Sequence, residues 1–245
     1  MATGKHRVWQ DTRIRTEPET DCVTCQIATI RATAGNKHPH TPADHPGATV
    51  FMDILPCKSS PGLTPKASYA HCLILVDAFS RFSVIYGLRY KTTQGVVETI
   101  LQYGADYKMA DELGYLDIDR VRADSGSEFT SGPFKQFCAT HKMNLSLAAP
   151  KRQDNSHLAE RSWQAVHKMA RSMLVHARLP DQYHYHAIRY AASVFNILPV
   201  KNLYNAEGEI ASPHELFCGS KPTISQYRVF GCPVVTNRSV VLIDG

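Results

Sequence analysis

The sequence predicts a mixed α/β domain, because short apolar runs typical of strands alternate with longer amphipathic stretches typical of helices. Between residues 48 and 198 these segments follow the order β-β-β-α-β-α-β-α-α. A chain of 245 residues with 43% apolar residues is long enough to bury one core and to carry small appendages. We therefore expect one mixed five-stranded sheet flanked by helices.

Five short runs have the length and apolar content of strands. The first three cover residues 49–55, 72–76 and 82–88, and the turn-like segment DAFSR joins the last two of these. The other two are predicted at 118–123 and 143–148, each beside a helical segment.

Helical patterns predict helices at 93–113, 132–141, 156–176 and 180–198. Thr93 is the expected N-cap of the first, because a threonine hydroxyl can accept a hydrogen bond from a free N–H group of the first turn. The segment SPHELFCGSKP predicts one more short helix, which ends at Gly219.

The chain is expected to have three parts. Residues 1–47 combine a polar segment with a linker rich in Pro, Gly and His; residues 48–200 hold the α/β core; residues 201–245 form a less regular extension. The final segment VVTNRSVVLIDG has the pattern of a strand pair without its partner. We therefore expect the chain to be a piece of a longer polyprotein.

The composition argues against several classes of protein. No apolar run approaches the roughly 20 residues of a membrane-spanning helix, and residues 1–13 lack the apolar segment of a secretory signal. Seven cysteines, an odd number, favour reduced thiols and an intracellular location in nucleus and cytoplasm. The net charge of +5 permits a polyanionic partner such as nucleic acid.

Three acidic residues stand where a carboxylate is costly. Asp53 interrupts the apolar run VFMDIL, Asp124 ends a predicted strand, and Glu160 opens a predicted helix. Buried carboxylates are unfavourable unless they are paired or bind metal, so three that converge would suit a hard divalent cation. Each has a simpler alternative: an outward-facing edge-strand residue, an Asp-Ser-Gly turn, and the positive end of a helix dipole.

Seven blocks of sequence together resemble the catalytic core of a retroviral-type integrase, most of all the copia class of LTR retrotransposons. Within them, 35 residues separate Asp124 from Glu160. In chain order from Cys22 to Gly231 the blocks are CVTC, FMDI, LVDAFSRF, RADSGSEF, AERSW, SPHELFCGSKP and RVFGC.

The resemblance implies a ribonuclease H-like fold and an enzyme that joins retrotransposon DNA 3′ ends to target DNA by polynucleotidyl transfer. It implies that Asp53, Asp124 and Glu160 form an Asp-Asp-Glu triad holding two Mg²⁺ or Mn²⁺ ions. The implied partners are element DNA ends, target DNA and further copies of the chain. Asp77, explained by an Asx turn or an ion pair, and Glu128 are left out of the predicted site.

The predicted helix that carries Glu160 has a polar stripe beside its apolar stripe, at roughly 100° per residue. The resemblance implies that basic residues on this helix face DNA, whereas the alternative is an ordinary solvated surface. The candidates for DNA binding, on the helix and in the loop before it, are Lys151, Arg152, Gln164, Lys168 and Arg171.

Ser156 and His157 replace the Asn-Gly pair that the family usually has before this helix. Ser156 can cap the helix, but histidine is denied some backbone conformations that glycine adopts. Two alternatives to an active integrase therefore stay open: a degenerate, catalytically inactive DNA-binding relic, and a ribonuclease H-type nuclease.

Cys22 and Cys25 resemble the second half of the His-His-Cys-Cys zinc module of integrases. A closed structural site needs four ligands, and the family's two histidines should lie upstream of this chain, so Zn²⁺ is expected in the full-length protein. The other possibility is a chance zinc finger of Cys22, Cys25, His40 and His45.

Overall fold

A computed structural model describes residues 43–57, 69–110, 114–147 and 157–233 of the chain. All of them lie in one unit, Asn36–Gly245. The predicted zinc ligands Cys22, Cys25 and His40 and the predicted terminal strand pair lie outside the described residues, and so does Ser156.

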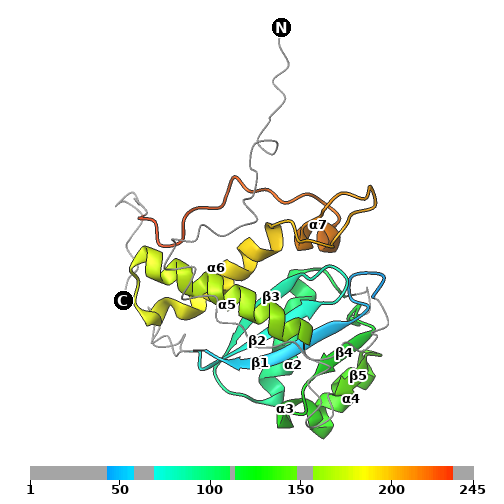
Figure 1. The fold of residues 1–245 in the computed structure, drawn as a ribbon. Helices are drawn as coiled ribbons and strands as arrows, with labels where there is room; N and C mark the ends of the chain where they lie inside the picture. Colours follow the sequence, from blue (N-terminus) through cyan, green and yellow to red (C-terminus); the bar gives the residue numbers. More distant parts are fainter. Residues whose placement is uncertain (1–42, 58–68, 111–113, 148–156, 234–245) are drawn as a thin grey trace, which may run out of the picture. The chain divides into compact units, whose positions relative to one another are not determined.

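The five predicted strands form one mixed sheet (Figure 1). The strands are β1 (Val50–Pro56), β2 (His71–Asp77), β3 (Ser83–Leu88), β4 (Arg120–Ala123) and β5 (Asn144–Leu147), in the order β3-β2-β1-β4-β5. The pairs β1/β2 and β2/β3 are antiparallel, whereas β1/β4 and β4/β5 are parallel. The prediction of a mixed five-stranded sheet is therefore confirmed.

Helices cover the sheet on two sides, as the amphipathic patterns predict (Figure 1). On one side lie α2 and α4, and on the other α5 and α6. The described helices are α2 (Thr93–Asp106), α3 (Ser127–Thr130), α4 (Gly132–Thr140), α5 (His157–Ala177), the 3₁₀ turn η2 (Asp181–Tyr183), α6 (His184–Ile197) and α7 (Pro213–Cys218). None of these helices is long and apolar enough to cross a membrane.

The alternation of side chains along β1 divides the core in two. Val50, Met52 and Ile54 pack with α2 and α4, whereas Phe51 and Leu55 pack with α5 and α6. β2 is buried on both faces from Cys72 onward, which explains its continuous apolar run CLILV.

The predicted helix at 93–113 is shorter than expected and has a different cap. It is α2, which ends at Asp106, because Lys108 turns the backbone to a left-handed conformation with φ 54°. Thr92, one residue before the predicted cap, accepts the Gly95 N–H bond at 3.2 Å. Thr93 instead donates to the carbonyl of Glu128 at 3.1 Å, so its hydroxyl ties α2 to α3.

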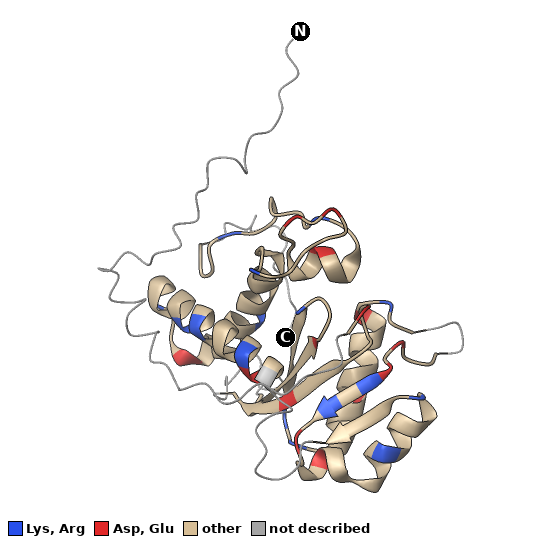
Figure 2. Ribbon diagram, turned by 45° about the vertical axis from the view of Figure 1, so that its right-hand side comes forward, with Lys and Arg blue, Asp and Glu red and all other residues tan. Residues whose placement is uncertain are grey.

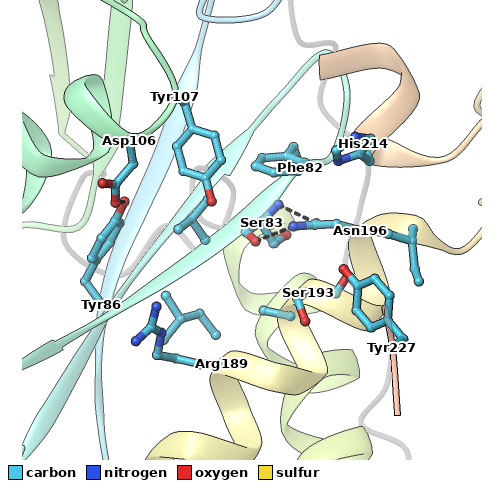
Figure 3. Close-up of a pocket in the computed structure, with 14 residues that line it drawn as sticks. Phe82, Ser83, Tyr86, Asp106, Tyr107, Arg189, Ser193, Asn196, His214 and Tyr227 are labelled. Atoms are coloured by element: carbon cyan, nitrogen blue, oxygen red, sulfur yellow. Dashed lines mark hydrogen bonds between the residues drawn. The ribbon is translucent and has the colours of Figure 1, made fainter. Parts of the chain in front are cut away.

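Side chains of α6 cover the outer edge of β3. The amide of Asn196 accepts from the N–H of Ser83 at 2.9 Å and donates to its carbonyl at 2.8 Å, as a neighbouring strand would (Figure 3). The hydroxyl of Tyr185 accepts the N–H of Gly87 at 2.9 Å. This edge of the sheet is therefore partly closed by side chains.

The segment after α6 packs back onto the core. α7 is capped by Ser212 and ends at Gly219, whose φ of 69° suits a residue without a Cβ. The ring of Phe217 stacks on that of Phe82, with centroids 4.4 Å apart. Further on, Gly231 has φ 77°, and a Cβ there would clash with Ala177 at the end of α5.

Candidate active site

Asp53 and Asp124 lie next to each other on neighbouring parallel strands. Val50 pairs with Val121 and Phe51 with Arg122, and continuing this register brings Asp53 level with Asp124, which follows the last residue of β4. Asp53 is two residues from Phe51, so the two side chains point to the same face of the sheet. Phe51 packs with α5, and Asp53 therefore faces the side that α5 covers.

Glu160 reaches the same side of the sheet from the first turn of α5. That helix docks on β1 and β2 through buried residues such as Ala159 and Val166. Glu160 itself is exposed and accepts a hydrogen bond from the amide of Gln164 at 3.3 Å.

The electrostatics of Asp53 link the three carboxylates. The pKa of Asp53 is raised to about 6, mainly by burial and next by the neighbouring charge of Asp124, with a smaller contribution from Glu160. Lys91 acts in the opposite direction and lowers the pKa of Asp53. A half-buried carboxylate of this kind is stabilised in its charged form by a nearby cation.

The three carboxylates are not gathered around a single point. In the described part of the chain, no group of three His, Cys, Asp or Glu side chains is placed closely enough to hold a metal ion. The two strand aspartates are therefore the fixed part of the site, and the exposed Glu160 is its outer member.

A fourth carboxylate, which the sequence analysis left out, lies beside Asp124. Glu128 is 2% exposed, and its Oε1 lies 3.0 Å from Nζ of Lys91. Gly126 separates Glu128 from Asp124, and its N–H donates to Oδ1 of Asp124 at 3.1 Å. A Cβ on Gly126 would clash with Glu128 and lie 3.0 Å from Oδ1 of Asp124, so glycine allows both side chains their places.

The block RADSGSEF contains Asp124, Gly126 and Glu128, so the sequence held a signal for the fourth carboxylate. It held none for Lys91, which meets Glu128 only because α2 packs against α3.

Asp77 lies outside this group and has a structural task. It is fully buried, and its carboxylate accepts hydrogen bonds from Ser80 N–H at 2.7 Å, Ser80 Oγ–H at 2.6 Å and Gly47 N–H at 2.8 Å. The two bonds from Ser80 close the turn between β2 and β3, and the bond from Gly47 ties the segment before β1 to this turn.

The predicted DNA-binding residues divide into two sets. Gln164 and Arg171 are exposed on α5 and Lys168 is half-buried there, and Figure 2 shows several basic positions along this helix. Lys151 and Arg152 lie outside the described residues. The buried stripe of α5 consists of Ala159, Ser162, Val166, Ala170 and Leu174.

His157 stands where the integrase family usually has glycine before this helix. It is the first residue of α5, so its backbone is helical and needs no glycine.

His45 contacts two aspartates. One of its ring nitrogens lies 2.7 Å from Asp44 and the other 3.3 Å from Asp119. His45 is the one member of the possible chance zinc finger within the described residues.

A separate hollow of about 290 Å³ lies between β3, the end of α2 and α6 (Figure 3). Its walls include Tyr86, Tyr107, Arg189, Asn196 and Tyr227. None of the four carboxylates nor Lys91 lines it, so this hollow is distinct from the candidate active site.

Solved structures share this fold. The catalytic core domain of HTLV-2 integrase in complex with magnesium aligns with a TM-score of 0.50 and 20% identity, over 71% of this chain and 97% of that chain. A simian T-cell lymphotropic virus intasome in complex with PP2A regulatory subunit B56 gamma aligns with a TM-score of 0.58 and 18% identity, over 89% and 69%. The fold is therefore of the ribonuclease H-like class.

Sequence comparison gives the family within that class. Residues 43–153 match the family described as Integrase core domain. The chain is 26% identical over 183 residues to a retrovirus-related Pol polyprotein from transposon RE1 of Arabidopsis thaliana, covering 75% of the chain and 11% of the polyprotein. It is 28% identical over 115 residues to that of transposon TNT 1-94 of Nicotiana tabacum, covering 47% and 8%. Residues 43–153 thus match an integrase core domain and resemble retrovirus-related Pol polyproteins, in a chain that spans about a tenth of these relatives.

Proposed function

We propose that the chain is the catalytic part of a copia-type retrotransposon integrase, which joins the 3′ ends of element DNA to target DNA in a metal-dependent reaction. The observation that carries this proposal is the placement of Asp53, half-buried and level with Asp124 on the next parallel strand, with its pKa raised to about 6. Further copies of the chain, element DNA ends and target DNA are the proposed partners.

The donor set fits a hard divalent cation such as Mg²⁺ or Mn²⁺. Carboxylate oxygens are the ligands that these ions prefer, and Mg²⁺ completes its shell with water and phosphate oxygens. Asp53 and Asp124 would hold the ions from the sheet, and Glu160 from α5. When bound, two such ions activate a hydroxyl nucleophile and stabilise the leaving oxygen of a phosphodiester.

The residues of the chain supply position and charge. β1 and β4 fix the two aspartates relative to each other, and the Gly126 N–H orients the Asp124 carboxylate. Gln164 donates a hydrogen bond to the side chain of Glu160, the outer member of the triad. Gln164, Lys168 and Arg171, and Lys151 and Arg152 before the helix, are the proposed contacts to DNA.

Substitution Asp124→Asn tests this proposal. Asparagine keeps an oxygen that can accept the Gly126 N–H bond, so the fold should persist while the negative charge is lost. We expect the variant to melt like the wild type and to lose oligonucleotide strand transfer by at least about a hundredfold, as for loss of other charge-stabilising groups. The matched control is Asp117→Asn, at an exposed carboxylate outside the site. Strand transfer that survives in Asp124→Asn contradicts the proposal.

A second candidate function is that of an inactive DNA-binding relic. It is favoured by the spacing of the described carboxylates, which do not enclose a metal ion as they stand. Titration of the wild-type chain with Mn²⁺, followed by calorimetry, discriminates the two: saturable binding that Asp124→Asn abolishes supports the enzyme. DNA binding without any metal binding supports the relic.

A further inference from the structure

The ion pair between Lys91 and Glu128 has one buried partner and one partly exposed partner. The Glu128 side chain is 1% exposed, whereas that of Lys91 is 41% exposed, and their charged atoms lie 3.0 Å apart. A lysine ammonium has three N–H donors and Glu128 takes one position around it. The ammonium is therefore held by a buried carboxylate, on a side chain that stays partly exposed to solvent.

Lys91 also lies close to the candidate active site. Hydrogen bonding to Glu128 raises the pKa of Lys91, and the charges of Asp124 and Asp53 add to this effect. The carboxylates of Asp124 and Glu128 approach each other around Gly126. One cation thus stands beside the two sheet aspartates.

A purely structural role does not account for this placement. The hydroxyl of Thr93 already ties the start of α2 to α3, through the Glu128 carbonyl at 3.1 Å and Ser131 Oγ at 2.9 Å. Neutralising the buried Glu128 carboxylate is also a structural task, but that task does not require an ammonium on a side chain that is 41% exposed. An accessible ammonium held beside the aspartates could, however, bind a backbone phosphate of DNA in the site.

We infer that Lys91 is a DNA-binding residue that contacts a backbone phosphate beside Asp53 and Asp124, and that Glu128 is the positioning residue that holds it there. This inference rests on the proposed function, since it concerns the substrate of the same site. Lysine suits the task because it acts as a point charge and needs no fixed geometry of the phosphate oxygens.

The test measures binding of a labelled DNA duplex by the 245-residue chain in EDTA, over a series of salt concentrations. Removal of one phosphate contact should reduce the slope of log K against log salt by about 1, and weaken binding about five- to tenfold at 0.1 M salt. We expect both changes in Lys91→Ala and neither in Lys91→Arg. The control Lys135→Ala, an exposed lysine on α4, should behave as the wild type.

A double variant separates binding from stability. Lys91→Ala alone leaves the buried Glu128 carboxylate without its cation and should lower the melting temperature. Lys91→Ala/Glu128→Gln removes that unpaired charge, so the melting temperature should recover while the reduced salt slope remains. If the salt slope recovers together with the melting temperature, Lys91 has only a structural role and the inference is overturned.

Glu128→Gln alone tests the positioning role by the sign of its effect. Loss of one negative charge near DNA should strengthen binding if charge alone matters. We expect binding two- to threefold weaker instead, at an unchanged salt slope, because Lys91 loses the partner that orders it; stronger binding overturns the positioning role. If Lys91→Ala binds DNA as tightly as the wild type and with the same salt slope, the inference about Lys91 is overturned but the proposed function is not. If the wild type itself does not bind DNA, the proposed function is overturned as well.

Discussion

Asp53 combines a position within the sheet with a carboxylate that favours its protonated form. Its pKa is raised from the ordinary 3.8 to about 6, first by burial and then by Asp124. Between about pH 4 and pH 6 the folded chain therefore binds more protons at this residue than the unfolded chain does. The free energy of unfolding should consequently fall as the pH rises through this window, and the loss should be complete above the folded pKa.

Substitution Asp53→Asn should remove this dependence. In EDTA, the free energy of unfolding of the variant should exceed that of the wild type at pH 7, and the two should converge as the pH falls towards 4. Urea unfolding at a series of pH values measures the difference. Asp117→Asn, at an exposed position, should run parallel to the wild type, and a parallel curve for Asp53→Asn would contradict the assigned environment.

Some residues of the candidate site could be predicted from the sequence, and others could not. Asp53, Asp124 and Glu160 stand out because each interrupts or ends a recognisable local pattern. Lys91 gave no such signal, since a lysine before a helix is ordinary. Glu128 lies in the block RADSGSEF but was left out of the predicted site. Only the packing of α2 against α3 brings these two together.

At the level of elements, the outer edge of β3 at Ser83 is satisfied by one side chain of α6. Asn196 satisfies both the N–H and the C=O of Ser83, and all of these groups are buried. Asn196→Ala should leave two polar backbone groups unpaired and lower the free energy of unfolding by about 2–4 kcal/mol.

Chemical denaturation of Asn196→Ala checks this value against Ser193→Ala on the same helix. The hydroxyl of Ser193 donates to the carbonyl of Tyr190 within α6, so its loss should cost less than about 1 kcal/mol. Equal losses for the two variants would show that water replaces Asn196 at the strand edge.

Element types followed from periodicity, whereas the element ends did not. All five strands and the longer helices lie where the apolar patterns predict them, because burial of one face imposes those patterns. α2 ends earlier than predicted because Lys108 takes a left-handed conformation, and it begins with a different cap because Thr93 finds a tertiary partner in α3. Such a choice depends on a neighbour that local sequence does not show.

For the molecule as a whole, the segment after α6 is part of the packed structure. Leu203 and Ala211 are buried, and α7 rests on the core through Phe217, which stacks on Phe82 and meets Tyr107 edge-on at 5.8 Å. The boundary predicted at residue 200 stays a prediction about sequence texture.

Phe217→Ala should therefore loosen this segment selectively. Loss of a half-buried ring and its aromatic contacts should lower the free energy of unfolding by about 2–3 kcal/mol. Hydrogen exchange should accelerate in residues 203–218 more than in the central strands. The exposed neighbour Cys218, changed to Ser, serves as the control. Uniform acceleration over the whole chain would instead mean that α7 and the sheet unfold as one cooperative unit.

The sequence by itself determined the class of fold, the order of the strands and helices along the chain, and the three candidate carboxylates. These features are local, because apolar periodicity and misplaced charges can be recognised within a few residues. The tertiary structure decided the pairing of Lys91 with Glu128, the closure of Ser83 by Asn196 from 113 residues away, and the level placement of Asp53 and Asp124. Those features depend on contacts between distant segments, whose geometry is set only when the two faces of the sheet are packed.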